Sequence, residues 1–170
     1  PCNILFSMPM ISNLSTSKGY RTIYYTSQRA KWGGFDNFLK SGDFSIIKGA
    51  EDFSLPTIND TGIDDFLMMK DLALEIEKSS NQKLLIVVFT NALHGPHQTN
   101  SEFKFNQKGL NSYEIAMRIL DASINEVFKS LKKTNRYDNS LIILTGDHGE
   151  VVENTKKLPR LASFYDDFIR

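Results

Sequence analysis

The alternation of apolar and polar positions along the chain predicts short strands and amphipathic helices. Strands are predicted where β-branched, aromatic and other apolar residues cluster, over residues 21–26, 44–47, 84–90 and 141–145. Helices are predicted over residues 35–40, 63–78 and 111–133. This order of elements predicts an α/β protein with a mostly parallel sheet sandwiched by helices.

Two of the predicted strands, residues 84–90 and 141–145, are nearly continuous apolar runs. Such runs are typical of parallel strands that are covered on both faces. The helix over residues 111–133 joins them, with Asn111 at its N-cap and Glu114 at the capping-box position. A strand, a helix and a parallel strand form a right-handed crossover, so both strands are expected to end at the same edge of the sheet.

Polar residues with ligand chemistry follow both of these strands. His94 comes after the first, and Gly-Asp-His-Gly-Glu at residues 146–150 comes after the second. Ligands of open α/β sheets bind beyond the carboxyl ends of the strands. A carboxylate beside an imidazole suits zinc or manganese, which makes Asp147 and His148 candidate metal ligands. The alternative is a helix-capping aspartate followed by a surface histidine.

A second acidic pair, Asp64 and Asp65, lies near the start of the helix predicted over residues 63–78. Two adjacent carboxylates are compatible with a metal site. Acids in the first turn of a helix also interact favourably with the helix dipole. We favour the second interpretation, in which these residues begin a helix.

Composition narrows the function classes. The chain has 170 residues, which fits one domain, and its 20 basic residues balance its 20 acidic residues. This balance does not favour binding to nucleic acid or to an anionic membrane surface. Cys2 is the single cysteine, which excludes an internal disulfide bond. The chain begins at Pro1 and contains no apolar run of the roughly 20 residues that span a bilayer, and we expect it to be a piece of a longer protein.

Several segments follow one another as they do in a known group of enzymes. They are Lys-Gly-Tyr-Arg-Thr at residues 18–22, Phe-Asp-Asn-Phe-Leu at 35–39, His-Gly-Pro at 94–96, and residues 137–150, which end in Thr-Gly-Asp-His-Gly-Glu. In this order the chain resembles the alkaline phosphatase/sulfatase superfamily. Within that superfamily it resembles membrane-anchored envelope enzymes, namely phosphoethanolamine transferases and lipoteichoic acid synthases. The resemblance implies an alkaline-phosphatase-like fold.

The resemblance also implies roles for individual residues. Asp147 and His148 match metal ligands, with zinc or manganese as the expected ion and calcium as an alternative. His94, the candidate catalytic residue, matches a histidine that contacts the substrate or a second metal. Asn91 and His97 are further candidate substrate-binding residues, and the alternative for His97 is an exposed loop histidine. We expect Glu150 to orient His148 or its loop.

These roles imply a metal-dependent hydrolase or transferase that acts on phosphate or sulfate esters of a cell-envelope lipid or glycan. A phosphoethanolamine transferase is the favoured type. We expect residues 1–170 to form one sulfatase-like catalytic domain that lacks its N-terminal nucleophile segment and its C-terminal end. The resemblance further implies a membrane anchor outside this chain and a domain on the periplasmic or extracellular side.

An inactive domain is the alternative function. Related enzymes have a further histidine within about 20 residues after the Asp-His pair, whereas residues 151–170 contain none. A catalytically inactive domain that binds a lipid or glycan therefore stays open as the second hypothesis.

Overall fold

The computed structural model describes residues 9–58, 62–79 and 81–148. The chain divides into two compact units, residues 1–138 and residues 139–170, and each is described by itself. Glu150 lies outside the described residues. The expectation of one domain over the whole chain stays a prediction.

The first unit alternates helices and strands. Its strands are β1 (Tyr20–Thr26), β2 (Ile46–Lys48) and β3 (Lys83–Phe89). Its α-helices are α1 (Ile11–Ser17), α2 (Phe35–Ser41), α3 (Asp65–Lys78) and α4 (Ser112–Lys133). Short 3-10 helices are η1 (Trp32–Gly34) and η2 (Ala50–Asp52), and η3 (Tyr137–Asn139) follows α4. The predicted order of elements is confirmed as far as residue 133, with the short strand β2 starting two residues later than expected.

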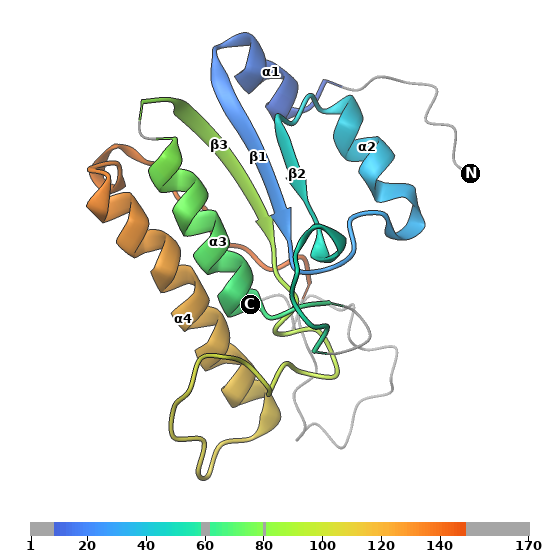
Figure 1. The fold of residues 1–170 in the computed structure, drawn as a ribbon, viewed down its shortest axis with the longest axis vertical. Coiled ribbons are helices and arrows are strands. Elements are labelled where there is room, and N and C mark those ends of the chain that lie inside the picture. The colour runs from blue at the N-terminus through green and yellow to red at the C-terminus, as the bar shows by residue number, and fades with distance from the viewer. Residues whose placement is uncertain (1–8, 59–61, 80, 149–170) are drawn as a thin grey trace. The chain divides into compact units, whose positions relative to one another are not determined.

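The three strands form one parallel sheet with the order β2-β1-β3. Tyr25 pairs with Lys48 of β2, and Thr26 at the end of β1 pairs with Phe89 at the end of β3. The carboxyl ends of β1 and β3 therefore lie side by side at one edge, as Figure 1 shows. The predicted α/β class with a parallel sheet is confirmed.

Side chains of β1 alternate between the two faces of this sheet. Ile23 and Tyr25 join the apolar core with Met68 and Leu72 of α3. On the other face, the ring of Tyr24 contacts Phe35 of α2 and Phe44, with centroids 6.1 and 5.7 Å apart. Figure 1 shows α3 and α4 on one side of the sheet and α2 on the other. The sheet is thus sandwiched by helices.

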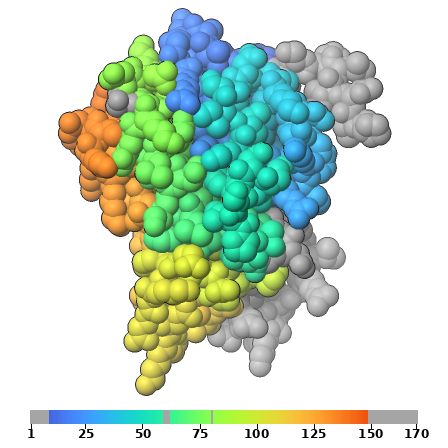
Figure 2. All heavy atoms as spheres, viewed as in Figure 1, coloured from blue at the N-terminus to red at the C-terminus, as the bar shows by residue number. Residues whose placement is uncertain are grey.

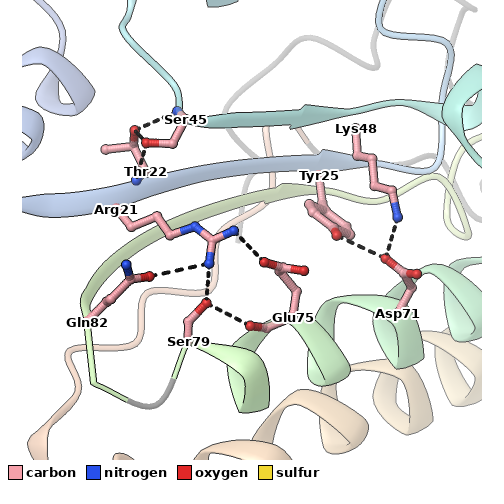
Figure 3. A network of polar contacts seen from close by, with 9 residues as sticks. All are labelled: Arg21, Thr22, Tyr25, Ser45, Lys48, Asp71, Glu75, Ser79 and Gln82. Atoms are coloured by element: carbon pink, nitrogen blue, oxygen red, sulfur yellow. Dashed lines mark hydrogen bonds and ion pairs between the residues drawn. The ribbon is translucent and has the colours of Figure 1, made fainter.

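Polar contacts at the margin of the core fix α3 against β1 (Figure 3). Arg21 Nη2 lies 2.6 Å from Glu75 Oε1, and the Tyr25 hydroxyl donates to Asp71 Oδ2 at 2.9 Å. Lys48 of β2 contacts the same Asp71 oxygen at 2.7 Å. Residues four apart on a helix share one face, so the two α3 carboxylates meet the sheet together. These contacts restrict sliding of α3 along the strand.

The long helix α4 begins with the predicted capping box. Asn111 Oδ1 accepts a hydrogen bond from the Glu114 backbone, and Glu114 Oε2 accepts one from the Asn111 backbone, both at 2.8 Å. Further along, α4 packs on α3, where the Ser130 hydroxyl donates to the Ala73 carbonyl at 2.8 Å. In Figure 2 the segment that leads into α4, in yellow, projects at the lower end of the first unit.

The strand predicted over residues 141–145 is wrong for the described structure. These residues belong to no helix or strand, and Leu141, Ile143 and Leu144 are 88%, 75% and 67% exposed. An apolar run favours a strand, but a strand exists only where a neighbouring strand provides hydrogen bonds. In the described residues the sheet consists of β2, β1 and β3 only, so the run does not pair with β3 and the predicted parallel crossover between them is not formed.

Candidate functional site

The connections of the sheet point to its carboxyl edge. The chain leaves β1 toward α2 on one face, and it leaves β3 toward α4 on the face that α3 covers. Strand order therefore reverses between β1 and β3, and such a switch point opens a crevice in which α/β proteins bind ligands. We place the candidate site at this edge, where the loops after Thr26 and Phe89 begin.

The two strand ends are joined by polar contacts. The Ser27 backbone donates to the Phe89 carbonyl at 3.3 Å, and Gln28 Nε2 donates to Asn91 Oδ1 at 3.0 Å. Asn91 is 1% exposed, so its side chain lies inside the protein. Its expected contact with a substrate stays a prediction, while its position at the switch point is clear.

A buried carboxylate holds the start of the loop after β3. Asp65, the first residue of α3, is fully buried and accepts hydrogen bonds from the Asn91 backbone at 3.0 Å and the Ala92 backbone at 2.7 Å. Burial raises the pKa of Asp65 to about 6, and the charge of Asp64 adds to this effect, whereas the accepted hydrogen bonds oppose it. The carboxyl group therefore titrates close to neutral pH.

Asp64 holds the middle of the same loop, at residues 98–102. Its Oδ1 accepts from the Phe66 backbone at 2.8 Å, so it is the N-cap of α3. The same carboxylate accepts from Gln98 Nε2 at 3.0 Å, the Ser101 hydroxyl at 2.9 Å and the Glu102 backbone at 2.7 Å. The prediction that these acids begin a helix is confirmed. Their contacts with the loop were not visible in the sequence.

The two histidines of this loop have different surroundings. His94 is exposed, and its Nδ1 lies 2.7 Å from the Gly95 carbonyl. Because a carbonyl only accepts, Nδ1 carries the hydrogen and Nε2 is left as a basic atom. His97 is half-buried, with Nδ1 3.2 Å from the Ser112 hydroxyl and its ring edge-on to Tyr113. His97 therefore packs the loop against α4, while its predicted role in substrate binding stays a prediction.

Asp147 and His148 belong to the second unit and are both exposed. His148 Nε2 lies 3.7 Å from Asp147 Oδ2, and the His148 backbone donates to Asp147 Oδ1 at 3.0 Å. Ligand atoms about 2.1 Å from a tetrahedral zinc ion are about 3.4 Å apart. The distance from Asp147 Oδ2 to His148 Nε2 is close to this separation, and metal binding by the pair stays a prediction.

The described residues do not complete a metal site. Among them, no group of three or more His, Cys, Asp or Glu side chains is arranged to hold a metal ion. Asp64 and Asp65 do not form one, because their oxygens accept hydrogen bonds from N–H and O–H donors. His94 lies in the first unit and the Asp147–His148 pair in the second, so their convergence stays a prediction.

A recess of about 730 Å³ lies at the opposite, amino edge of the sheet. Its lining includes Lys18, Arg21 and Lys83. Arg21 is already paired with Glu75 at 2.6 Å, and parallel sheets bind ligands at their carboxyl edge. We therefore do not assign the chemistry to this recess.

Sequence reasoning missed three contributors to the carboxyl edge: Gln28, Asp65 as a loop contact, and Gly62. A Cβ at Gly62 would lie 2.1 Å from the Ser27 carbonyl oxygen, so only glycine lets the start of α3 approach the end of β1 this closely. Gln28 could have been found from the sequence, because it closely follows the strand predicted over residues 21–26. Buried contacts such as those of Asp65 leave no sequence signal.

Solved structures share this fold. The lipoteichoic acid synthase LtaP from Listeria monocytogenes superimposes with a TM-score of 0.72 at 18% identity, over 96% of this chain and 41% of that one. An alkaline phosphatase superfamily protein from Vibrio parahaemolyticus superimposes with a TM-score of 0.62 at 19% identity, over 75% and 32% of the two chains. These likenesses define the class as an α/β domain of alkaline-phosphatase-like fold, as predicted.

The family follows from the sequence comparison. The family model described as Sulfatase matches residues 4–167. The chain belongs to the sulfatase family, within the alkaline phosphatase superfamily, as the resemblance implied.

Curated relatives include lipoteichoic acid synthases. Lipoteichoic acid synthase 1 of Bacillus subtilis is 26% identical over 79% of this chain, and the synthase of Staphylococcus aureus strain USA300 is 27% identical over 79%. The chain spans only 21% of the length of each. Across the described residues, no helix is long and apolar enough to cross a membrane.

Proposed function

We propose that this protein is a metal-dependent enzyme that hydrolyses or transfers a phosphate or sulfate ester of a cell-envelope lipid or glycan. The observation that carries the proposal is the Asp147–His148 pair, with donor atoms 3.7 Å apart in a chain of the sulfatase family. Phosphoethanolamine transfer, the type that the resemblance implied, is the one to test first. Membrane attachment and an extracellular or periplasmic domain belong to the same proposal.

The residues would divide the work as follows. Asp147 and His148 would hold a zinc or manganese ion, with calcium as an alternative. When bound, such an ion neutralises charge on the ester and lowers the pKa of a nucleophile. His94 would exchange a proton with the leaving oxygen through Nε2, because its Nδ1 hydrogen is bound to the Gly95 carbonyl.

The remaining predicted residues would support binding. His97 would bind the substrate from the same loop as His94, although its Nε2 is buried in the described structure. Asn91 would contribute to substrate binding from the start of the loop after β3. Glu150 would orient His148.

The test measures metal and turnover in the full-length protein. We expect bound zinc or manganese and cleavage of an aryl phosphate or an aryl sulfate. Asp147→Ala should remove the metal and lower kcat/KM by more than the roughly 10–100-fold that loss of an outer partner of a ligand causes. Asp121→Ala, an exposed aspartate on α4, is the matched control and should change neither. A wild-type protein without metal and without turnover would contradict the proposal.

A specific sequence observation supports the inactive alternative. The only histidines are His94, His97 and His148, so the further histidine expected after the Asp-His pair is absent from residues 149–170. An inactive domain would bind an envelope lipid or glycan with the same affinity before and after the substitution Asp147→Ala. An enzyme would lose turnover on the same substitution.

A further inference from the structure

One loop, residues 90–111, connects β3 to α4, and a pair of neighbouring carboxylates holds its start and its middle. Asp65 accepts hydrogen bonds from the Asn91 and Ala92 backbones, at 3.0 and 2.7 Å. Asp64 accepts from the Ser101 hydroxyl and the Glu102 backbone, at 2.9 and 2.7 Å. His94 lies between these two anchored segments.

These contacts exceed what the start of a helix requires. Capping uses one acceptor for a free N–H of the first turn, and Asp64 Oδ1 meets that need through Phe66. The contacts with residues 91, 92, 101 and 102 are between segments far apart in the sequence, and both carboxylates are at most 3% exposed. Buried carboxylates with N–H and O–H donors form strong, directional hydrogen bonds.

The carboxylates are themselves attached to a rigid element. Helix α3 is fixed to β1 through Arg21–Glu75 and Tyr25–Asp71 (Figure 3). It also begins where Gly62 packs on the Ser27 backbone. The loop is therefore held to the sheet in two ways. It is covalently linked to β3, and it is hydrogen-bonded to α3, which is itself fixed to β1.

We propose that Asp64 and Asp65 are positioning residues that fix the loop bearing His94 relative to the carboxyl edge of the sheet. The catalytic part of this inference rests on the proposed function, in which His94 contacts the substrate. A metal-binding role for this acidic pair is not consistent with the geometry, because hydrogen-bond donors of the protein already surround its oxygens.

The test uses Asp65→Asn in the full-length protein. The substitution keeps the shape, removes the negative charge and leaves one acceptor oxygen where the carboxylate has two, Oδ2 for Asn91 and Ala92 and Oδ1 for Asn91. We expect faster amide exchange at residues 91 and 92, unchanged metal content, and a kcat lowered about 10–100-fold with a smaller change in KM. A misplacement of about 1 Å has effects of this size on catalysis. Asp121→Asn is the matched control.

A second variant guards against loss of folding. Ser101→Ala removes one donor to Asp64 and should give a smaller decrease in kcat, with faster exchange at residue 102. Exchange of β1 and β3 amides reports whether each variant is folded. If folded Asp65→Asn keeps the kcat of Asp121→Asn, or if residues 91 and 92 exchange as in the wild type, the inference is wrong. If the wild type has no turnover, the proposed function fails, while the exchange measurements still decide whether the carboxylates hold the loop.

Discussion

A fully buried carboxyl group at the first residue of α3 makes the stability of the fold depend on pH. Burial raises the pKa of Asp65 from 3.8 to about 6, so the folded protein binds the Asp65 proton more tightly than the unfolded chain. Its contribution to stability is therefore present in full below about pH 4. It is lost as the pH rises through about 6, where the folded protein must hold a buried charge.

The magnitude follows from the pKa. One pKa unit corresponds to about 1.4 kcal/mol, so this group should lower the free energy of unfolding by up to about 3 kcal/mol between pH 4 and pH 7. Urea unfolding of the wild type and Asp65→Asn across this range measures it. The stability difference, wild type minus variant, should decrease as the pH rises. An increase would mean that the accepted hydrogen bonds outweigh burial.

At the scale of elements, the capping box predicts a measurable part of the stability of α4. Asn111 and Glu114 each accept a hydrogen bond from the backbone of the other, at 2.8 Å. Asn111→Ala removes one of these acceptors and should lower the free energy of unfolding by about 1 kcal/mol. Asn125→Ala, at an exposed position inside the same helix, should be neutral or slightly stabilising because alanine is the better helix former. Equal effects of the two substitutions would exclude a specific role for the cap.

Elements with local signals were predicted well, and elements that depend on distant partners were not. The limits of α3 and α4 follow from Asp64, Asn111 and helical spacing, all of which act within a few residues. The run at residues 141–145 has the composition of a strand, yet its outcome depends on pairing with a segment that its own sequence does not specify.

The candidate site divides in the same way. His94 was located correctly after β3 because a strand end is a local feature. The contact between Gln28 and Asn91 joins residues 63 positions apart, and the contact between Asp64 and Glu102 joins residues 38 positions apart. Contacts between residues so far apart in the sequence depend on the tertiary fold. The periodicity of apolar residues does not reveal them.

At the scale of the whole molecule, the fold match covers 96% of the chain and the family match covers residues 4–167. The described structure, by contrast, divides at residue 138 into two units. His94 and the Asp147–His148 pair are on different sides of this division. Whether they serve one reaction is therefore a question about the assembled protein, and the proposed function requires that they do.

Manganese offers a direct measurement, because its unpaired electrons broaden NMR signals of nearby nuclei. In the full-length protein, added Mn²⁺ should broaden the imidazole signals of His148, as a ligand, and of His94, as a neighbour in the same site. Backbone signals of Lys18 and Lys83 at the amino edge should broaden much less, since the carboxyl and amino edges are separated by the seven-residue length of β3. Asp147→Ala should abolish the broadening of both histidines. If His148 broadens while His94 does not, the metal pair and the loop after β3 do not share a site, and His94 has no part in the proposed reaction.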